Sequence, residues 1–216
     1  MELQPNKTEK ELQNTGNIET DNVEIDNTAA DSTAADIWVS PLYTERPEDI
    51  SGRQEKEIAV YDLLDKLDIR YERVDHEVTP SIESCHSVDE KLGLHICKNL
   101  FLCNRQKTDF YLLLMPGDKV FRTKDLSKQI GSARLSFADA EYMEQYLNIQ
   151  PGAVSIMGLM NDTEGHVRLL VDREVAEEEY IGFHPCVNTA SLKARTEDIM
   201  NKFLPAVGHE ITVVEL

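Results

Sequence analysis

The sequence predicts a mixed α+β fold in which helices flank one curved β-sheet. Short strand-like runs outnumber those that a simple parallel α/β unit would use, helical segments fall irregularly between them, and no internal repeat is present. Hydrophobic residues make up 41% of the 216 residues, which is enough for one domain with a core.

The first predicted element is a helix. Ser51-x-x-Gln54 resembles a capping box, and apolar residues then recur at helical spacing as far as Leu67. Residues 69–74 alternate between apolar and polar side chains, as in a half-buried strand. Residues 87–94 are typical of a short helix.

Two apolar runs predict buried strands at 96–103 and 110–115, joined by a polar turn. Residues 123–130 form a short predicted helix that stops before a glycine. A further helix is expected over 136–147, with Ser136 as its cap.

Strand-like runs dominate the C-terminal third. We expect strands at 154–160, 167–171 and 180–183, a helix over 196–204 and a last strand at 211–214.

Residues 1–36 differ in composition from the rest. They hold nine acids, two lysines and no aromatic residue, so they cannot bury enough apolar surface to offset chain entropy. We therefore expect a disordered acidic tail over 1–36, a proline-containing linker over 37–50 and one domain over 51–216. The alternative for the tail is a partner-binding peptide.

Charge and composition exclude several classes of protein. The net charge is −18 and the pI is near 4.7, which excludes coating of nucleic acid or anionic membrane through bulk charge. No run approaches the ~18 apolar residues of a membrane helix, and the N-terminus lacks the apolar run of a signal peptide. The 4 cysteines are too scattered for a secreted disulfide scaffold. We expect reduced thiols and a cytoplasmic protein.

The stretch 98–134 is basic although the chain is acidic. Such a local group of bases could bind a partner that presents its phosphates at one place on the surface. The alternative is a solvent-exposed face whose charge is compensated by acids nearby in space. Against three acids the stretch holds eight bases: Lys98, Arg105, Lys107, Lys119, Arg122, Lys124, Lys128 and Arg134.

The common catalytic and metal-binding motifs are absent. Cys85-His86 and His184-x-Cys186 lack the spacing of zinc ligands, and there is no G-x-S-x-G, P-loop or G-x-G-x-x-G sequence. We therefore expect no metal and no cofactor. A thiol-redox site at Cys97 and Cys103 has little support, because six residues along one strand separate them by about 20 Å.

Three local features could carry chemistry. Lys98 lies in a mostly apolar strand and faces either solvent or a cleft, where its ammonium group could bind a phosphate. Gly152 either makes a turn or leaves its bare backbone open to a substrate carbonyl. The segment 182–189, with His184 and Asn188, is either a structural turn or a loop that orients a small polar substrate.

Six segments in register carry a resemblance to a known family. They are Cys97–Leu102, Arg134–Ala138, Pro151–Ser155, Gly158–Asp162, Phe183–Pro185 with Asn188–Thr189, and Gly208–His209. The chain resembles the YbaK-type aminoacyl-tRNA deacylases, particularly the free-standing PrdX-like or ProX-type branch that is similar to the editing domain of prolyl-tRNA synthetase. The resemblance covers about 51–216 and misses the tail.

The resemblance implies trans-editing, which is hydrolysis of an amino acid wrongly esterified to a tRNA, most often alanine on the proline tRNA. It also implies a mixed, partly barrel-like sheet flanked by helices. An ester is already activated, so the site need only position a water and stabilise the oxyanion. The implied partners are the acceptor stem and CCA end of mischarged proline tRNA and, in addition, prolyl-tRNA synthetase; no membrane is involved.

The resemblance also implies roles for individual residues. Lys98 matches an essential lysine that contacts the phosphate of the terminal adenosine, Gly152 begins the loop that holds the aminoacyl ester, and His184 matches a histidine near the 3′ end of the substrate. We expect substrate binding by Asn99, Ser155, Ile156, Met157 and Asn188. We expect tRNA binding by Arg105, Lys107, Arg122, Lys124 and Arg134.

The chain departs from the family pattern in the loop that begins at Gly152. The family sequence G-x-x-x-P-F ends here in Ile156 and Met157. Loss of the proline removes a fixed φ and restores a backbone donor, and methionine makes a softer wall than phenylalanine. The amino acid that is removed therefore stays open. So does the alternative of a non-catalytic sensor that binds an amino acid or a charged tRNA.

Overall fold

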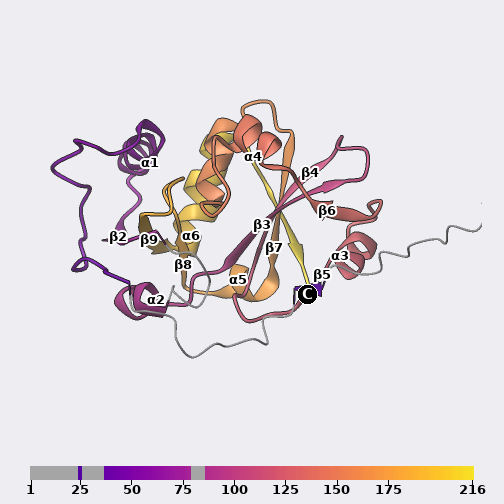
Figure 1. Ribbon diagram of the computed structural model, residues 1–216, viewed down its shortest axis with the longest axis horizontal. Helices are drawn as coiled ribbons and strands as arrows, with labels where there is room; N and C mark the ends of the chain where they lie inside the picture. Colours follow the sequence, from indigo (N-terminus) through magenta and orange to yellow (C-terminus); the bar gives the residue numbers. More distant parts are fainter. Residues whose placement is uncertain (1–23, 26–36, 79–85) are drawn as a thin grey trace, which may run out of the picture.

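The computed structural model describes residues 24–25, 37–78 and 86–216, and these form two main β-sheets with helices around them (Figure 1). The larger sheet is mixed and has the order β10-β7-β4-β3-β6, and the smaller one is antiparallel with the order β2-β9-β8. The expected mixed α+β class is confirmed, although the strands divide between two sheets and the larger sheet does not close into a barrel.

The larger sheet contains β3 (Lys98–Asn104), β4 (Phe110–Met115), β6 (Leu135–Phe137), β7 (Val167–Asp172) and β10 (Ile211–Val214). The smaller sheet contains β2 (Tyr71–Asp75), β8 (Tyr180–Phe183) and β9 (Ala190–Arg195). A short antiparallel pair joins β1 (Glu24–Ile25) to β5 (Phe121–Arg122). The α-helices are α1 (Glu55–Lys66), α2 (His86–Leu92), α3 (Thr123–Gln129), α4 (Ala140–Leu147), α5 (Arg173–Glu177), α6 (Thr196–Asp198) and α7 (Leu204–Val207). A 3₁₀ helix, η2 (Ile156–Asn161), and a π-helical turn, η3 (Ile199–Phe203), complete the described elements.

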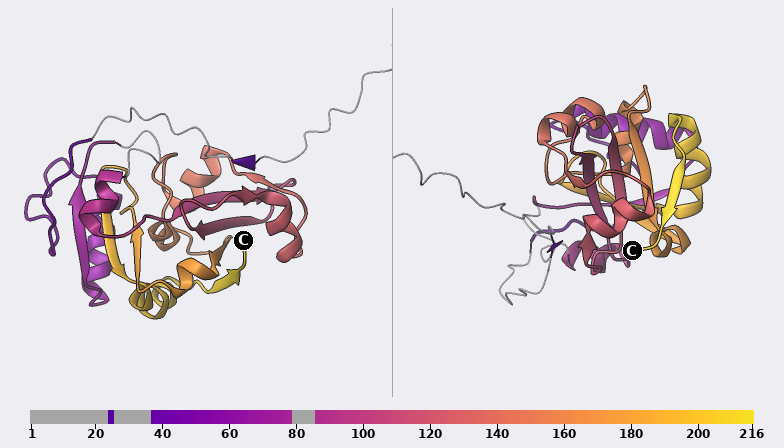
Figure 2. Two further views of the ribbon diagram at one scale, coloured as in Figure 1. Left: turned by 90° about the horizontal axis from the view of Figure 1, so that it is seen from below. Right: turned by 90° about the vertical axis from the view of Figure 1, so that its right-hand side faces the viewer.

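The strand β4 lies at the centre of the larger sheet, and all of its residues are buried. Alternate side chains such as Leu112 and Leu114 point toward the main core, where α1, α4, η2 and the helices after β9 pack. The intervening residues, such as Leu113, point to the opposite face, which α3 and β5 cover. Each fully buried side chain of this kind stabilises the fold by about 1.5–3 kcal/mol. Figure 2 shows the helices on the two sides of this sheet.

Several expected elements are confirmed, and others differ from the expectation in type or bounds. The segment expected as a strand at 154–160 is the 3₁₀ helix η2, because the Ser155 side chain accepts a hydrogen bond from the Met157 backbone at 3.2 Å and caps the turn. The helix expected over 136–147 begins only at Ala140, since the residues before it pair with β3 as β6.

The first helix begins at Glu55 and has Gln54 at its N-cap, so Ser51 does not cap it. The strand β9 was not expected at all. Its sequence, Ala-Ser-Leu-Lys-Ala-Arg, contains no β-branched or aromatic residue, yet β9 is the central strand of the smaller sheet. Pairing on both sides therefore outweighs its weak intrinsic preference.

The predicted linker packs on the domain. Ser40 and Tyr43 donate backbone hydrogen bonds to β2 at 2.8 Å each, so the segment extends the edge of the smaller sheet. The predicted tail over 1–36 lies outside the described residues except for β1. Within the described residues no helix has the length and apolar character needed to cross a membrane.

A partly buried ionic network joins α1 to β2. Asp75 accepts two hydrogen bonds from Arg53, at 2.8 and 3.0 Å, and one from Arg73 at 2.6 Å. Arg53 also pairs with Glu57, which in turn accepts a hydrogen bond from the Tyr61 hydroxyl at 3.1 Å. The side chains of Glu57 and Arg73 are only 4% and 5% exposed, so their charges depend on these partners.

Candidate active site

Two loops meet at the end of the smaller sheet. The loop 150–155 leads into η2, and the loop 184–189 connects β8 to β9. The Ser155 hydroxyl donates to the carbonyl oxygen of His184 at 2.6 Å, which fixes one loop to the other. We call Gly152, Ser155, His184 and Asn188 the two-loop site.

Gly152 is suited to its place in this site. Its φ of +89° lies in the region that favours glycine. A Cβ atom at this position would lie 3.5 Å from Nδ2 of Asn188, so the missing side chain leaves this amide accessible from the glycine side. The structure therefore brings the backbone of Gly152 and the side chain of Asn188 together.

The imidazole of His184 is held by β9. Its Nδ1 lies 2.9 Å from the carbonyl oxygen of Ala190, which can only accept, so Nδ1 carries the proton. Burial lowers the pKa of His184 to about 4, against the opposing hydrogen bond to Ala190 and with a smaller contribution from His76. The ring is therefore neutral at pH 7. Its Nε2 has a lone pair and no hydrogen-bond partner among residues 37–78 and 86–216.

Lys98 lies at the first position of β3, and its side chain points to the face of that strand opposite Cys97. The preceding residue, Cys97, directs its thiol at the carbonyl oxygen of Gly182 over 3.8 Å. A Cβ atom on Gly182 would lie 2.6 Å from Cδ1 of Leu94 and 3.0 Å from Cγ1 of Ile96, so these side chains would have to shift to admit it. The Lys98 side chain itself leaves the sheet toward Lys119, whose carbonyl oxygen accepts from Nζ at 3.2 Å.

The charge of Lys98 is poorly compensated. The residue is 9% exposed, and burial lowers its pKa, against a weaker effect of Asp118. Within the described part of the chain no hydrogen bond links Lys98 to either loop of the two-loop site. The structure therefore brings together Gly152, Ser155, His184 and Asn188, whereas the side chain of Lys98, at the start of β3, is hydrogen-bonded to Lys119.

Asn99 points to the same face of β3 as the main core. Its Nδ2 donates to the carbonyl oxygen of Cys97 at 3.1 Å. Its Oδ1 is buried and has no hydrogen-bond partner among the described residues, which costs about 1–3 kcal/mol. An unpaired buried acceptor one residue after Lys98 can accept a hydrogen bond from a donor outside the described residues, such as a ligand.

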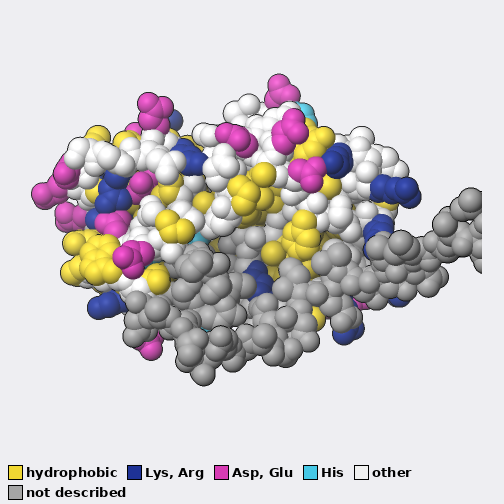
Figure 3. Space-filling view, viewed as in Figure 1, with side chains coloured by type: hydrophobic (Ala, Val, Ile, Leu, Met, Phe, Trp, Pro, Cys, Tyr) yellow, Lys and Arg dark blue, Asp and Glu magenta, His cyan; other side chains and the backbone are white. Residues whose placement is uncertain are grey.

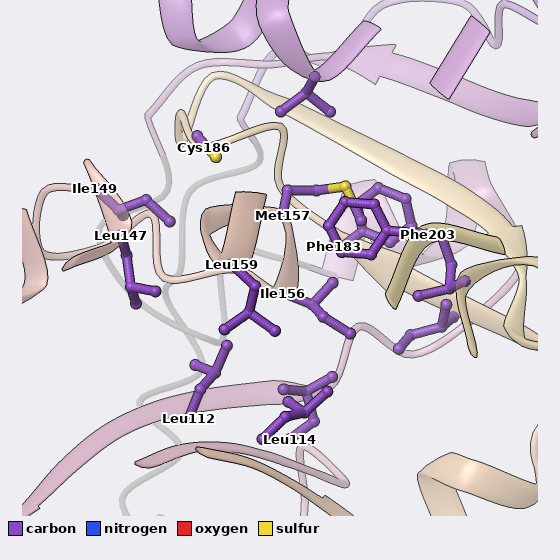
Figure 4. Packing of buried hydrophobic residues seen from close by; sticks show 14 of the residues in the cluster. Leu112, Leu114, Leu147, Ile149, Ile156, Met157, Leu159, Phe183, Cys186 and Phe203 are labelled. Carbon is purple, nitrogen blue, oxygen red and sulfur yellow. The ribbon is translucent and has the colours of Figure 1, made fainter. Parts of the chain in front are cut away.

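Ile156 and Met157 are fully buried in the main core. Figure 4 shows Met157 extending toward Phe183 and Ile156 lying above Leu114. These two side chains support the two-loop site from beneath, so their effect on a substrate would pass through the backbone of the loop.

The residues expected to bind tRNA fall into two groups. Arg105 and Lys107 are exposed near the turn between β3 and β4, where Lys107 pairs with Asp139. Arg122 and Lys124 lie at the start of α3, and Arg134 precedes β6; all three are exposed. Because β6 pairs Leu135 with Asn104, Arg134 lies at the same end of β3 as Arg105 and Lys107, and Arg122 and Lys124 form the second group. In Figure 3, Lys and Arg side chains lie along the right-hand edge of the molecule, and acidic and basic side chains are mixed on its left-hand part.

The thiols of the described residues are packed in the core. Cys97, Cys103 and Cys186 are free and buried, and burial raises the pKa values of Cys97 and Cys186 to about 12. Such thiols form almost no thiolate at neutral pH, which argues against a nucleophilic or redox role. Cys85 lies outside the described residues, and no group of His, Cys, Asp and Glu among those described could hold a metal ion.

This burial predicts how the thiols react. In a Cys85→Ser variant at about pH 8, an aromatic disulfide reagent will modify the remaining thiols only after denaturant is added, because thiolates are the reactive species. The absorbance of the released aromatic thiol measures the reaction. Rapid modification of Cys97 or Cys186 in the native protein would contradict their packing.

The comparisons with known proteins agree on one family. A family model described as "Aminoacyl-tRNA editing domain" matches residues 76–202. The chain is 32% identical over 158 residues to "Prolyl-tRNA editing protein ProX" of Acetoanaerobium sticklandii, covering 73% of this chain and 96% of that protein. It is 34% identical over 152 residues to "Prolyl-tRNA synthetase associated domain-containing protein 1" of Mus musculus, covering 68% and 88%.

A solved structure agrees at the level of the fold. The crystal structure of a hypothetical protein superposes with a TM-score of 0.54 at 16% identity, covering 72% of this chain and 96% of that one. The sequence-based expectation of an editing family is thereby confirmed. His76 and Ser191, which lie against His184, were not expected as site residues, because no local motif marks two residues that are 115 positions apart.

Proposed function

Because this chain belongs to the aminoacyl-tRNA editing domain family, we propose that it is a trans-editing deacylase that releases alanine from alanyl-tRNA(Pro) in the cytoplasm. The observation that carries the proposal is the two-loop site. There, the hydrogen bond from Ser155 to His184 holds a glycine backbone and a neutral histidine together. No sequence motif for a nucleophile is needed for this reaction, since the ester is already activated.

The proposed reaction is hydrolysis of the aminoacyl ester. A water oxygen adds to the ester carbonyl carbon, the bond from that carbon to the ribose oxygen breaks, and the ribose oxygen leaves with a proton as a hydroxyl. Nε2 of His184 accepts a hydrogen bond from the attacking water or from a ribose hydroxyl, as its free lone pair allows. The backbone around Gly152 and the Asn188 amide lie against the oxyanion that develops.

The binding of the 3′ end would use β3. Lys98 supplies a positive charge for a phosphate, and the unpaired Oδ1 of Asn99 accepts a hydrogen bond from a hydroxyl or the α-ammonium group. Selection against proline would be steric, because a pocket shaped for alanine excludes the larger ring. The buried Ile156 and Met157 would set the height of this pocket through the loop.

A panel of esters tests the specificity. Alanyl-, prolyl-, seryl- and cysteinyl-tRNA(Pro) are mixed with excess protein in single-turnover assays at low salt. We expect fast loss of alanine while proline is retained. Release of serine or cysteine in place of alanine would refute the assignment of alanine as the substrate but would still support a deacylase. Binding of a charged tRNA or of an amino acid without any hydrolysis would support the non-catalytic sensor instead.

The exposed side chain of Lys124 gives a separate prediction about tRNA binding. If α3 faces the acceptor stem, Lys124→Ala will weaken tRNA binding about threefold at low salt and will reduce the slope of log K against log salt by about 1. Filter binding between about 50 and 200 mM salt measures both values. An unchanged slope would remove α3 from the tRNA contact.

A further inference from the structure

A buried chain of polar groups runs behind the two-loop site. His76, just after β2, places Nε2 2.9 Å from the hydroxyl oxygen of Ser191 on β9. The same hydroxyl oxygen lies 3.3 Å from Nδ1 of His184. The two imidazole rings are 6.0 Å apart, with Ser191 hydrogen-bonded to both. His76 is 3% exposed and Ser191 is fully buried, so these contacts are not shared with solvent.

The acceptors around these groups determine where the protons lie. Nδ1 of His76 is 2.8 Å from the carbonyl oxygen of Glu77 and must donate to it, which leaves Nε2 of a neutral ring as an acceptor. The Ser191 hydroxyl therefore donates to His76. Because the only proton of the Ser191 hydroxyl is in that hydrogen bond, its oxygen can only accept a hydrogen bond from His184.

His184 consequently meets two acceptors on the same side of its ring. The carbonyl oxygen of Ala190 lies 2.9 Å from Nδ1 and the Ser191 oxygen lies 3.3 Å from it. A lone pair on Nδ1 would face both oxygens and be repelled by them. The proton is thus held on Nδ1, and Nε2 is the acceptor.

We propose that His76 and Ser191 are positioning residues that hold His184 in the Nδ1–H tautomer, so that its Nε2 accepts a hydrogen bond from water or a ribose hydroxyl during ester hydrolysis. This inference rests on the proposed function for the identity of the ligand. The tautomer itself is a property of the free protein and can be measured without any substrate.

The arrangement separates two roles. Only His184 would contact the reacting groups, whereas His76 acts through Ser191 and never meets the substrate. If Ser191 loses its hydroxyl, one of the two acceptors at Nδ1 disappears. If His76 is replaced by leucine, the Ser191 hydroxyl becomes free to donate to Nδ1 of His184, which opposes the Ala190 carbonyl oxygen and weakens the preference for the Nδ1–H tautomer.

The first test is nitrogen-15 NMR of the full-length protein at pH 7, using long-range couplings to assign each imidazole nitrogen. We expect His184 to be neutral with the proton on Nδ1. His76→Leu and Ser191→Ala should each produce a measurable population with the proton on Nε2. A wild-type His184 that is charged or protonated on Nε2 would overturn the proposal, whatever the protein does to tRNA.

The second test measures single-turnover deacylation of alanyl-tRNA(Pro). Ser191→Ala should lower the rate constant about tenfold with little change in the half-saturating protein concentration. His76→Gln keeps an acceptor for the Ser191 hydroxyl and should retain most of the rate that His76→Leu loses. The double variant His76→Leu/Ser191→Ala should lose no more than Ser191→Ala alone, because both residues act through one chain.

Ser127→Ala is the matched control. Ser127 is also a buried serine with a hydrogen-bonded hydroxyl, which donates to the backbone carbonyl of Thr123 at 2.7 Å. We expect a similar loss of thermal stability but a wild-type His184 tautomer and rate. Equal losses of rate in Ser127→Ala and Ser191→Ala, or an unchanged tautomer in both His76→Leu and Ser191→Ala, would show a structural role only. If no variant and no wild-type protein hydrolyses the ester, the proposed function fails, while the NMR result still decides the tautomer.

Discussion

Lys98→Met will lower the single-turnover rate of deacylation about 100-fold, which corresponds to about 2.7 kcal/mol of lost transition-state stabilisation. The ammonium group of Lys98 is almost buried, and its hydrogen-bond partner among the described residues is a carbonyl oxygen. A buried charge without a carboxylate partner is costly unless a ligand supplies the opposite charge. A phosphate of the tRNA end would supply it, with a charge-assisted contact.

The same variant should leave the fold intact. Methionine keeps the apolar stem that lies along β3 and removes the desolvated charge, so we expect the free energy of unfolding to stay within about 1 kcal/mol of the wild-type value. Lys66→Met, at the exposed C-terminal end of α1, is the control and should change neither quantity. A Lys98→Met protein that is folded and within twofold of the wild-type rate would remove Lys98 from the site.

Asp75→Ala will reduce the free energy of unfolding by about 3 kcal/mol. Asp75 is the carboxylate that Arg53 and Arg73 share, and Arg73 is almost completely buried. Without Asp75 two guanidinium groups face each other, and one of them cannot reach water. Urea denaturation measures the loss. The matched control is Asp62→Ala, which removes an exposed partner of Arg46 and should cost less than about 0.5 kcal/mol.

The contribution of Asp75 also has a defined pH dependence. Burial raises the pKa of Asp75, but hydrogen bonds from Arg53 and Arg73 outweigh it and hold the pKa below its usual value. The stabilisation is therefore fully present above the unfolded pKa of about 3.9 and is lost as the pH falls through the lower folded pKa. The difference in stability between the wild type and Asp75→Asn should narrow below about pH 4. A difference that is equal at pH 7 and pH 3 would contradict this assignment.

Much of the fold could be predicted from the sequence, because runs of apolar residues in the sequence are the segments that are buried in the structure. The run 110–115 was expected as a buried strand, and β4 is buried on both faces. The sequence-based prediction was wrong where a local side-chain hydrogen bond or pairing between distant strands determines the structure. Ser155 caps a 3₁₀ turn where apolar residues had suggested a strand, and β9 forms from a segment with weak strand preference because β2 and β8 pair with it on both sides.

The candidate site was predictable only in part for the same reason. Gly152, His184 and Asn188 were marked by local sequence and by the family resemblance, and the structure brings them together. His76 follows β2 and Ser191 lies in β9, and the antiparallel register that pairs Val74 with Ser191 brings them side by side. No spacing within one segment contains that information. The core positions of Ile156 and Met157 likewise emerge only once η2 is packed on β4 and β8.

The release of alanine from alanyl-tRNA(Pro) by excess protein, followed over time against prolyl-tRNA(Pro), tests the central claim most directly. With wild-type protein at low salt, alanine should be released at least about 100-fold faster than in buffer, prolyl-tRNA(Pro) should remain charged, and Lys98→Met should return the alanine curve toward the buffer rate. An alanine curve that follows the buffer curve in the presence of folded wild-type protein would contradict the deacylase assignment.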